Sequence, residues 1–162
     1  MIESPLLFFT MELDETPKLN MGRLFLIDTS DRGIVGRWVA SSGLGDYQGT
    51  TGWAKQGGGV IPPTYKLAKP VSFYSVATRP VWQDLNGIQT NTYKISPEVV
   101  TTTEGVQRSE LLIHRSRFAH PMSGSLGCIV LPDTEFSNFE KVYKNECGHL
   151  EQIPLLVGYT FD

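Results

Sequence analysis

The sequence contains little cysteine, no long apolar run and no excess of positive charge, and each shortage argues against a class of protein. Two cysteines in 162 residues are too few for the disulfide framework of a small secreted domain. No apolar stretch approaches the roughly 20 residues that cross a bilayer, so we expect no membrane span. Fourteen basic and seventeen acidic side chains give a net charge of -3. This balance argues against nucleic acid as a partner, because such proteins carry a clustered basic footprint.

The N-terminal residues lack the pattern of a secretion signal. They have no basic start, and the apolar run from Pro5 to Phe9 is too short for the core of a signal peptide. We therefore expect a cytoplasmic protein, a protein exported by a route that needs no such signal, or a mature form. If the protein is made in the cytoplasm, action outside it would require specialised secretion or cell lysis.

The composition that is present predicts one globular, mostly β domain over residues 1–162. Hydrophobic residues make up 40% and charged residues 19%, and sixteen glycines and ten prolines are spread between short apolar runs. The expected strands are 6–11, 23–28, 34–40, 64–69, 71–76, 89–94, 111–114, 128–131 and 154–159. Asn86-Gly87 has the composition of a tight hairpin turn.

One helix is expected after this series of strands. Asp133 can cap its start, and Gly148 can end it. Phe136, Phe139 and Tyr143 recur near helical spacing, so we interpret them as core packing rather than as a binding surface. The fold class is thus β-rich with small α content and one main helix.

Residues 41–61 are rich in glycine but contain no known phosphate-binding motif. The segment lacks the GxxxxGK[ST] spacing, and no GxGxxG follows a strand. We expect a long mobile loop on one edge of the sheet that forms a wall of the active site.

The most informative segment is LLIHRSRFAHPMSGSLGCIVLP, residues 111–132. His114 ends one apolar run, and a Ser-x-Gly-Cys turn opens the next run at Cys128. If these runs are neighbouring strands, the thiol and the imidazole meet, as cysteine nucleophiles require. The backbone N–H groups of Gly127 and Cys128 would then face a developing oxyanion, and Ser125 would hold the turn. The alternative is a Cys128 that is only a small buried hydrophobe.

Other histidines and cysteines suggest weaker alternatives. A zinc site from His114, His120, Cys128 and Cys147 would have suitable ligands, but the spacings match no common zinc pattern. A disulfide between Cys128 and Cys147 is a further alternative. His149 follows the helix and is interpreted as a helix-end residue. We expect no metal and no organic cofactor.

These motifs together resemble the catalytic domain of the L,D-transpeptidases, the YkuD-type fold. His114 matches the family's strand-ending histidine, and Ser125-Leu126-Gly127-Cys128 matches its Ser/Thr-His-Gly-Cys segment. RLFLIDTSDRGIVGRWVASSG (residues 23–43) and VIPPTYKL (residues 60–67) resemble its opening hairpin and a later strand. The resemblance covers most of residues 23–161 and implies a β-sandwich or open barrel with one main helix after the cysteine.

The resemblance also implies an activity on peptidoglycan stem peptides. Cys128 would attack the amide before a terminal D-alanine, and His114 would transfer the proton. The thioacyl intermediate would pass to an amine (transpeptidation) or to water (L,D-carboxypeptidase). Arg115, Arg117 and Tyr65 are the expected substrate contacts. The resemblance therefore implies that the protein acts in the periplasm or at the cell wall. We expect a monomer whose other partners would be an immunity or delivery protein.

Three positions depart from the family pattern. The family's second histidine is Leu126 here, the polar residue two positions after the cysteine is Val130, and the glycine after the first histidine is Arg115. These changes suggest a divergent branch. They also leave two alternatives open: a catalytically silent module that binds the cell wall or a protein, and a cysteine hydrolase with another substrate.

Overall fold

The computed structural model describes residues 1–162 except 17–18, 31–32, 45–46, 57, 86, 117–126 and 162. The elements in chain order are β1 (Pro5–Leu13), β2 (Gly22–Asp28), β3 (Gly33–Ser42), η2 (Gly52–Ala54), η3 (Thr64–Lys66), β4 (Tyr74–Ala77), β5 (Val81–Leu85), β6 (Ile88–Ser96), β7 (Val99–Thr101), β8 (Gln107–Ser109), β9 (Leu112–Arg115), β10 (Ile129–Leu131), α1 (Asp133–Cys147) and β11 (Gln152–Phe161).

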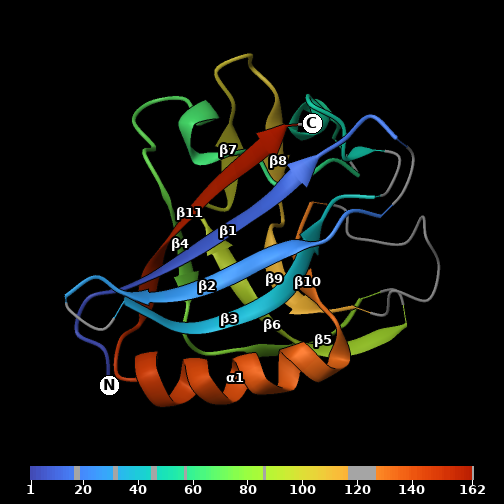
Figure 1. The fold of residues 1–162 in the computed structure, drawn as a ribbon. Coiled ribbons are helices and arrows are strands. Elements are labelled where there is room, and N and C mark those ends of the chain that lie inside the picture. The colour runs from blue at the N-terminus through green and yellow to red at the C-terminus, as the bar shows by residue number, and fades with distance from the viewer. Residues whose placement is uncertain are drawn as a thin grey trace.

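The strands form a closed barrel. The sheet order is β4-β11-β1-β2-β3-β10-β9-β6-β5, and a further pairing of β4 with β6 closes the ring (Figure 1). Strand β5 extends the sheet beyond β6, and β7 and β8 form a separate hairpin. The prediction of a mostly β fold with one main helix after Cys128 is confirmed. The β4–β6 pairing closes the barrel that we expected to be open.

The core follows from alternation along the strands. In β1, every second residue from Pro5 to Leu13 is buried, which is the period of a strand with one face inward. Helix α1 lies across one end of the barrel (Figure 1). Its Phe139 contacts Trp38 of β3 edge-on at 5.1 Å and Tyr93 of β6 at 5.6 Å between ring centroids. The aromatic stripe is therefore core, as expected.

The local predictions were correct for the long strands and wrong in shorter segments. Residues 64–69 are not a strand: Thr64–Lys66 form a short 3-10 helix, because the backbone N–H groups of Lys66 and Leu67 donate locally, to the carbonyls of Pro63 at 2.9 Å and Thr64 at 3.2 Å. Of residues 71–76, only 74–76 lie in a strand. Strands β7 and β8 were not expected. Asp133 does not cap α1, since Pro132 is the N-cap residue, but Gly148 follows its last residue as expected.

The glycine-rich segment is more firmly held than the expected mobile loop. Strand β3 extends into it as far as Ser42, and η2 lies within it. The buried Gln48 side-chain amide donates to the carbonyl of Ser42 at 2.7 Å and to the Ser41 hydroxyl at 3.0 Å. Trp53 is also buried and stacks on Tyr159 of β11. The described part of this segment is held by side-chain hydrogen bonds that no local sequence motif predicts.

Among the described residues, no helix is both long and apolar enough to cross a membrane.

Candidate active site

Strands β9 and β10 are neighbours and run parallel, as the His114–Cys128 hypothesis requires. Val130 pairs with His114, and Ile129 pairs with Ile113. Ile113 and Ile129 belong to the hydrophobic core. Because side chains alternate across a strand, His114 and Cys128 share the other face of the sheet. Cys128 lies directly before β10, two positions before the partner of His114, a diagonal separation of about 8 Å between Cα atoms.

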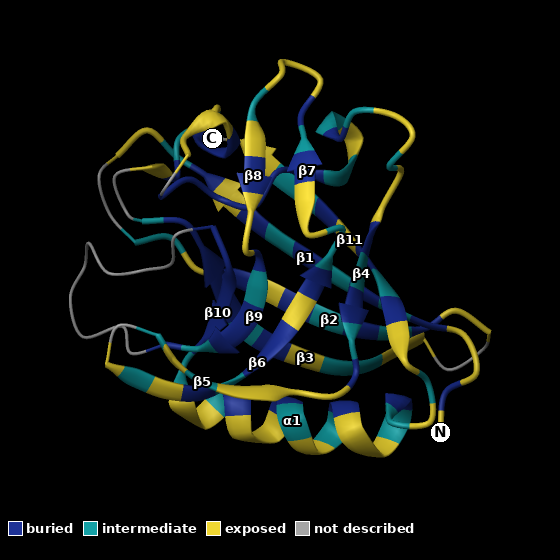
Figure 2. Ribbon diagram, turned by 180° about the vertical axis from the view of Figure 1, so that it is seen from behind, coloured by how far each residue is buried: buried dark blue, intermediate teal, exposed yellow. Residues whose placement is uncertain are grey.

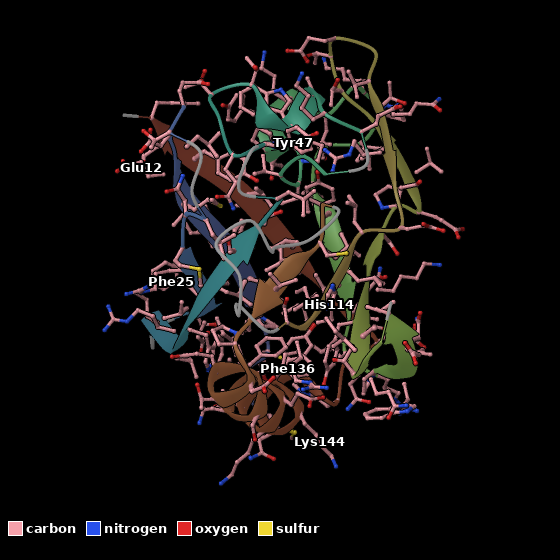
Figure 3. The ribbon with its side chains drawn as sticks, turned by 90° about the vertical axis from the view of Figure 1, so that its right-hand side faces the viewer. Glu12, Phe25, Tyr47, His114, Phe136 and Lys144 are labelled. Atoms are coloured by element: carbon pink, nitrogen blue, oxygen red, sulfur yellow. The ribbon has the colours of Figure 1, made fainter. Side chains whose placement is uncertain are left out.

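His114 is held as a neutral imidazole. Its Nδ1 lies 2.7 Å from the carbonyl oxygen of Arg115, and a carbonyl only accepts, so Nδ1 carries the proton. The lone pair is then on Nε2, the nitrogen that can act as a base. Burial lowers the pKa of His114, although the bond to Arg115 opposes the shift. In Figure 3, His114 lies on the flank of the barrel, between Tyr47 towards one end and Phe136 of α1 at the other.

The thiol of Cys128 is held in its protonated form. Only 8% of the residue is exposed, and β10 beyond it is buried along its whole length (Figure 2). Sγ donates a hydrogen bond to the carbonyl of Glu110 at 3.6 Å. Burial raises the pKa of Cys128 to about 11, whereas the Leu112 backbone N–H and the Arg108 charge lower it. At rest, burial thus favours the neutral form of both the Cys128 thiol and the His114 imidazole.

Arg108, on β8, places a buried cation beside this thiol. It is 4% exposed, and its guanidinium donates to the carbonyls of Trp53 at 3.0 Å, Val60 at 2.8 Å and Gly59 at 2.9 Å. Burial lowers its pKa, and the neighbouring Tyr74, Tyr159 and Cys128 oppose that shift. In the sequence it appears only as one member of a basic cluster with Arg115 and Arg117. Its partners are backbone atoms distant in the chain, so no motif predicts its place.

Four consecutive carbonyls next to the site accept hydrogen bonds from the side chains of two buried residues, Arg108 and Tyr74, and one partly buried residue, Tyr159. Arg108 donates to Gly59 and Val60, the hydroxyl of Tyr159 to Ile61, and that of Tyr74 to Pro62 at 2.6 Å. On the same segment, the Ile61 backbone N–H donates to the Ser42 hydroxyl at 2.9 Å, and that hydroxyl donates to the Gly127 carbonyl at 3.4 Å. Residues 59–62 are therefore a fixed platform that connects β3, β8 and the turn before Cys128.

Gly127 meets two requirements at once. Its φ is +113°, in the region that favours glycine. A Cβ placed on it would lie 2.1 Å from Nη2 of Arg108. The glycine before the cysteine therefore lets the guanidinium approach the backbone beside the thiol. The proposed oxyanion role of the N–H groups at Gly127 and Cys128 stays a prediction.

Two of the expected substrate contacts lie elsewhere. Arg115 follows His114 but points to the opposite face, where its guanidinium forms an ion pair with Asp133 of α1 at 3.1 Å and donates to the Gln89 carbonyl. Tyr65 is 60% exposed on η3, which packs against β11, across the barrel from β10. The structure brings neither side chain to the Cys128–His114 pair. Arg117, Ser125, His120 and Leu126 lie outside the described residues.

Neither the disulfide nor the zinc alternative gains support. Neither Cys128 nor Cys147 forms a disulfide. Within the described ranges, no group of three or more His, Cys, Asp or Glu side chains could hold a metal ion.

Two hollows open on the surface near this region. One, of ≈ 430 Å³, lies between the glycine-rich segment and the β7–β8 hairpin and includes Tyr47 and Lys55. The other, of ≈ 220 Å³, lies between β5 and α1 and includes Trp82 and Arg115. Among the described residues, Cys128 and His114 line neither of these two hollows.

No model of a known protein family matches this chain, and no curated protein matches it.

Proposed function

We propose that this protein is a cysteine acyl-transfer enzyme that acts on peptidoglycan stem peptides. The observation that carries the proposal is the parallel pairing of β9 with β10, which places Cys128 and His114 on one face of the sheet. The substrate class comes from the resemblance of the His114 and Ser-x-Gly-Cys segments to the L,D-transpeptidases. The same resemblance suggests that the protein acts at the cell wall, after specialised secretion or lysis.

The proposed reaction begins from a neutral thiol and proceeds by general-base catalysis. Nε2 of His114 takes the thiol proton as Sγ bonds to the carbonyl carbon before the terminal D-alanine. The imidazolium then protonates the amide nitrogen as the C–N bond breaks, and D-alanine leaves. An amine or water attacks the thioester, and the thiol is regenerated. The neutral Nδ1–H tautomer of His114 supports this order, because it leaves Nε2 as the base.

A second candidate is a silent binding module on the same fold. The raised pKa of Cys128, its 8% exposure and its absence from both hollows favour this alternative. A buried neutral thiol is the usual state of a structural cysteine.

Intact mass and product analysis with a tetrapeptide-bearing muropeptide separates the two candidates. The enzyme is expected to release D-alanine and to carry a transient acyl adduct on Cys128. Cys128→Ala should abolish both, and His114→Gln should reduce the rate by about 10²-fold or more, the usual contribution of a general base. Cys147→Ala is the matched control, since Cys147 is the other buried cysteine and its removal is expected to leave the reaction intact.

The outcome assigns the function directly. Turnover that survives Cys128→Ala would contradict the proposed nucleophile. No turnover and no adduct on the folded wild type, together with binding of the muropeptide, would establish the silent module. The ratio of hydrolysed to amine-linked product would show whether water or an amine accepts the acyl group.

A further inference from the structure

Arg108 is a buried cation whose guanidinium donates to backbone carbonyls of the described residues. In the part of the chain that the structure describes, no carboxylate lies within ion-pair distance of its guanidinium. Three of its five N–H groups donate to backbone carbonyls, which are dipoles without net charge. An unpaired buried charge is costly, so a nearby group that becomes an anion gains stability from it.

The group in position to become that anion is the thiol of Cys128. The Arg108 guanidinium contacts the backbone at Gly127, the residue directly before the cysteine. Sγ itself points to the carbonyl of Glu110, two positions after Arg108 in the chain. Arg108 and Cys128 thus approach each other from β8 and from the start of β10.

We propose that Arg108 is the counter-ion of the Cys128 thiolate and sets the ionisation of the nucleophile. The inference rests on the proposed function only in taking Cys128 as the reacting group. When the thiol proton moves to Nε2 of His114, the negative charge on sulfur is stabilised by a permanent guanidinium. In this arrangement His114 accepts the proton, and the Cys128 thiolate forms its ion pair with the Arg108 guanidinium.

The charged groups around the Cys128 thiol have opposite effects on its pKa. Glu110 faces it from the same chain segment and raises its pKa, whereas Arg108 lowers it. His114 is the titratable group on the neighbouring position of β9. Lys94 of β6 is paired in register with Leu112, and its ammonium lies 4.0 Å from Glu98. Removing the charge of Arg108 or of Glu110 should therefore change the thiol pKa in opposite directions.

The test measures alkylation of Cys128 by iodoacetamide, a neutral reagent, from pH 7 to 9, with peptide mapping to assign the site. Arg108→Met should slow alkylation at a fixed pH by about tenfold, the effect of one pKa unit on the thiolate fraction. Arg108→Lys should remain close to the wild type, because it keeps the charge. Glu110→Gln should accelerate the reaction. Arg37→Met, which removes an exposed arginine of β3, is the matched control and should change nothing.

A second pair of variants keeps Arg108 intact, in case its removal prevents folding. Cys128→Asp places a permanent anion at the sulfur, and Cys128→Asn is its neutral counterpart of the same shape. If Arg108 is the counter-ion, the Cys128→Asp variant should unfold at a higher denaturant concentration than the Cys128→Asn variant at pH 7. The difference should disappear at a pH low enough to protonate the carboxylate. Asn equal to or more stable than Asp would overturn the inference. So would equal alkylation rates in Arg108→Met and the wild type, or Arg108→Lys as slow as Arg108→Met.

These readouts are independent of any wall substrate. If the muropeptide reaction fails but the charge series behaves as expected, the counter-ion role stands and the substrate class is wrong. If the muropeptide reaction succeeds but the charge variants all alkylate at the same rate, the enzymatic function is supported and Arg108 only holds residues 59–62 in place.

Discussion

Gly127 shows how a single residue can combine two constraints. Its φ of +113° disfavours any side chain, and a Cβ would collide with Arg108 Nη2 at 2.1 Å. We expect Gly127→Ala to lower the free energy of unfolding by about 2–4 kcal/mol, the sum of backbone strain and a displaced buried cation. It should also slow alkylation of Cys128, since the guanidinium must move. Chemical denaturation and the iodoacetamide rate measure the two effects.

Gly105 is the matched control for that variant. Its φ is +87°, but a Cβ there would meet nothing within 4 Å. Gly105→Ala should therefore cost only the backbone term, about 1 kcal/mol, and leave the alkylation rate unchanged. Equal losses of stability in the two variants would mean that contact with Arg108 contributes nothing.

At the residue scale, the sequence identifies candidate functional residues better than it predicts which groups they contact. The placement of Cys128 and His114 on neighbouring strands follows from a histidine that ends one apolar run and a cysteine that opens the next. The location of Arg108 does not follow, because its three acceptors are carbonyls 48 to 55 positions away in the chain. Arg115 has the right charge and neighbourhood for a substrate contact, yet strand alternation turns it towards Asp133.

Helix α1 is stabilised by the aromatic face that it buries at one end of the barrel. Phe139 is fully buried and contacts the rings of Trp38, Tyr93 and Tyr143. Phe139→Ala should cost about 3–5 kcal/mol, the usual price of removing a buried phenyl ring. Lys141→Ala, on the exposed face of the same helix, should change stability by less than about 0.5 kcal/mol. Denaturant titration of both variants tests this, and a small loss for Phe139→Ala would contradict the packing role of α1.

The elements that could be predicted are those long enough for their pattern of hydrophobic residues to repeat several times. Strand β1 alternates over 9 residues, and the 15-residue helix α1 repeats its aromatic side chains from Phe136 to Tyr143, so local pattern determines each. Strands β7 and β8 have 3 residues each, too few for a period to show. The 3-10 turn at Thr64 is attached to β11 by a hydrogen bond from the Val157 backbone N–H to the Thr64 hydroxyl, a contact across 93 positions of the chain.

The closed ring determines where the site lies in the whole molecule. Strands β9 and β10 pair in parallel, although only 13 residues separate Arg115 from Ile129 in the chain. Cys128, directly before β10, therefore lies two positions along the ladder from Val130, the partner of His114. The opposite side of the ring is formed by β1 and β11, which also run parallel and pair over residues 7–13. The N-terminal and C-terminal strands thus complete the barrel, and the site depends on a closure that both ends of the chain contribute.

This barrel buries six groups whose ionisation would oppose folding, and that predicts sensitivity to alkali. Burial raises the pKa of Cys128 to about 11 and of Cys147 to about 12, and it raises the pKa of Tyr74, Tyr93, Tyr143 and Tyr159. In the unfolded chain these groups lose protons near pH 8.5 for cysteine and about 10 for tyrosine. Above those values the unfolded state binds fewer protons than the folded state, so stability falls as pH rises.

The free energy of unfolding should therefore be nearly independent of these groups below about pH 8 and decline above about pH 9. The decline should be about 1.4 kcal/mol per pH unit for each titrating group and should steepen when the tyrosines join the thiols. Denaturant titrations from pH 7 to 11 measure the slope. Tyr74→Phe should make it shallower by about one proton above pH 10, whereas Tyr65→Phe, at an exposed position, should leave it unchanged. A flat profile to pH 11 would contradict the burial of these hydroxyls and thiols, and with it the neutral resting thiol from which the proposed reaction starts.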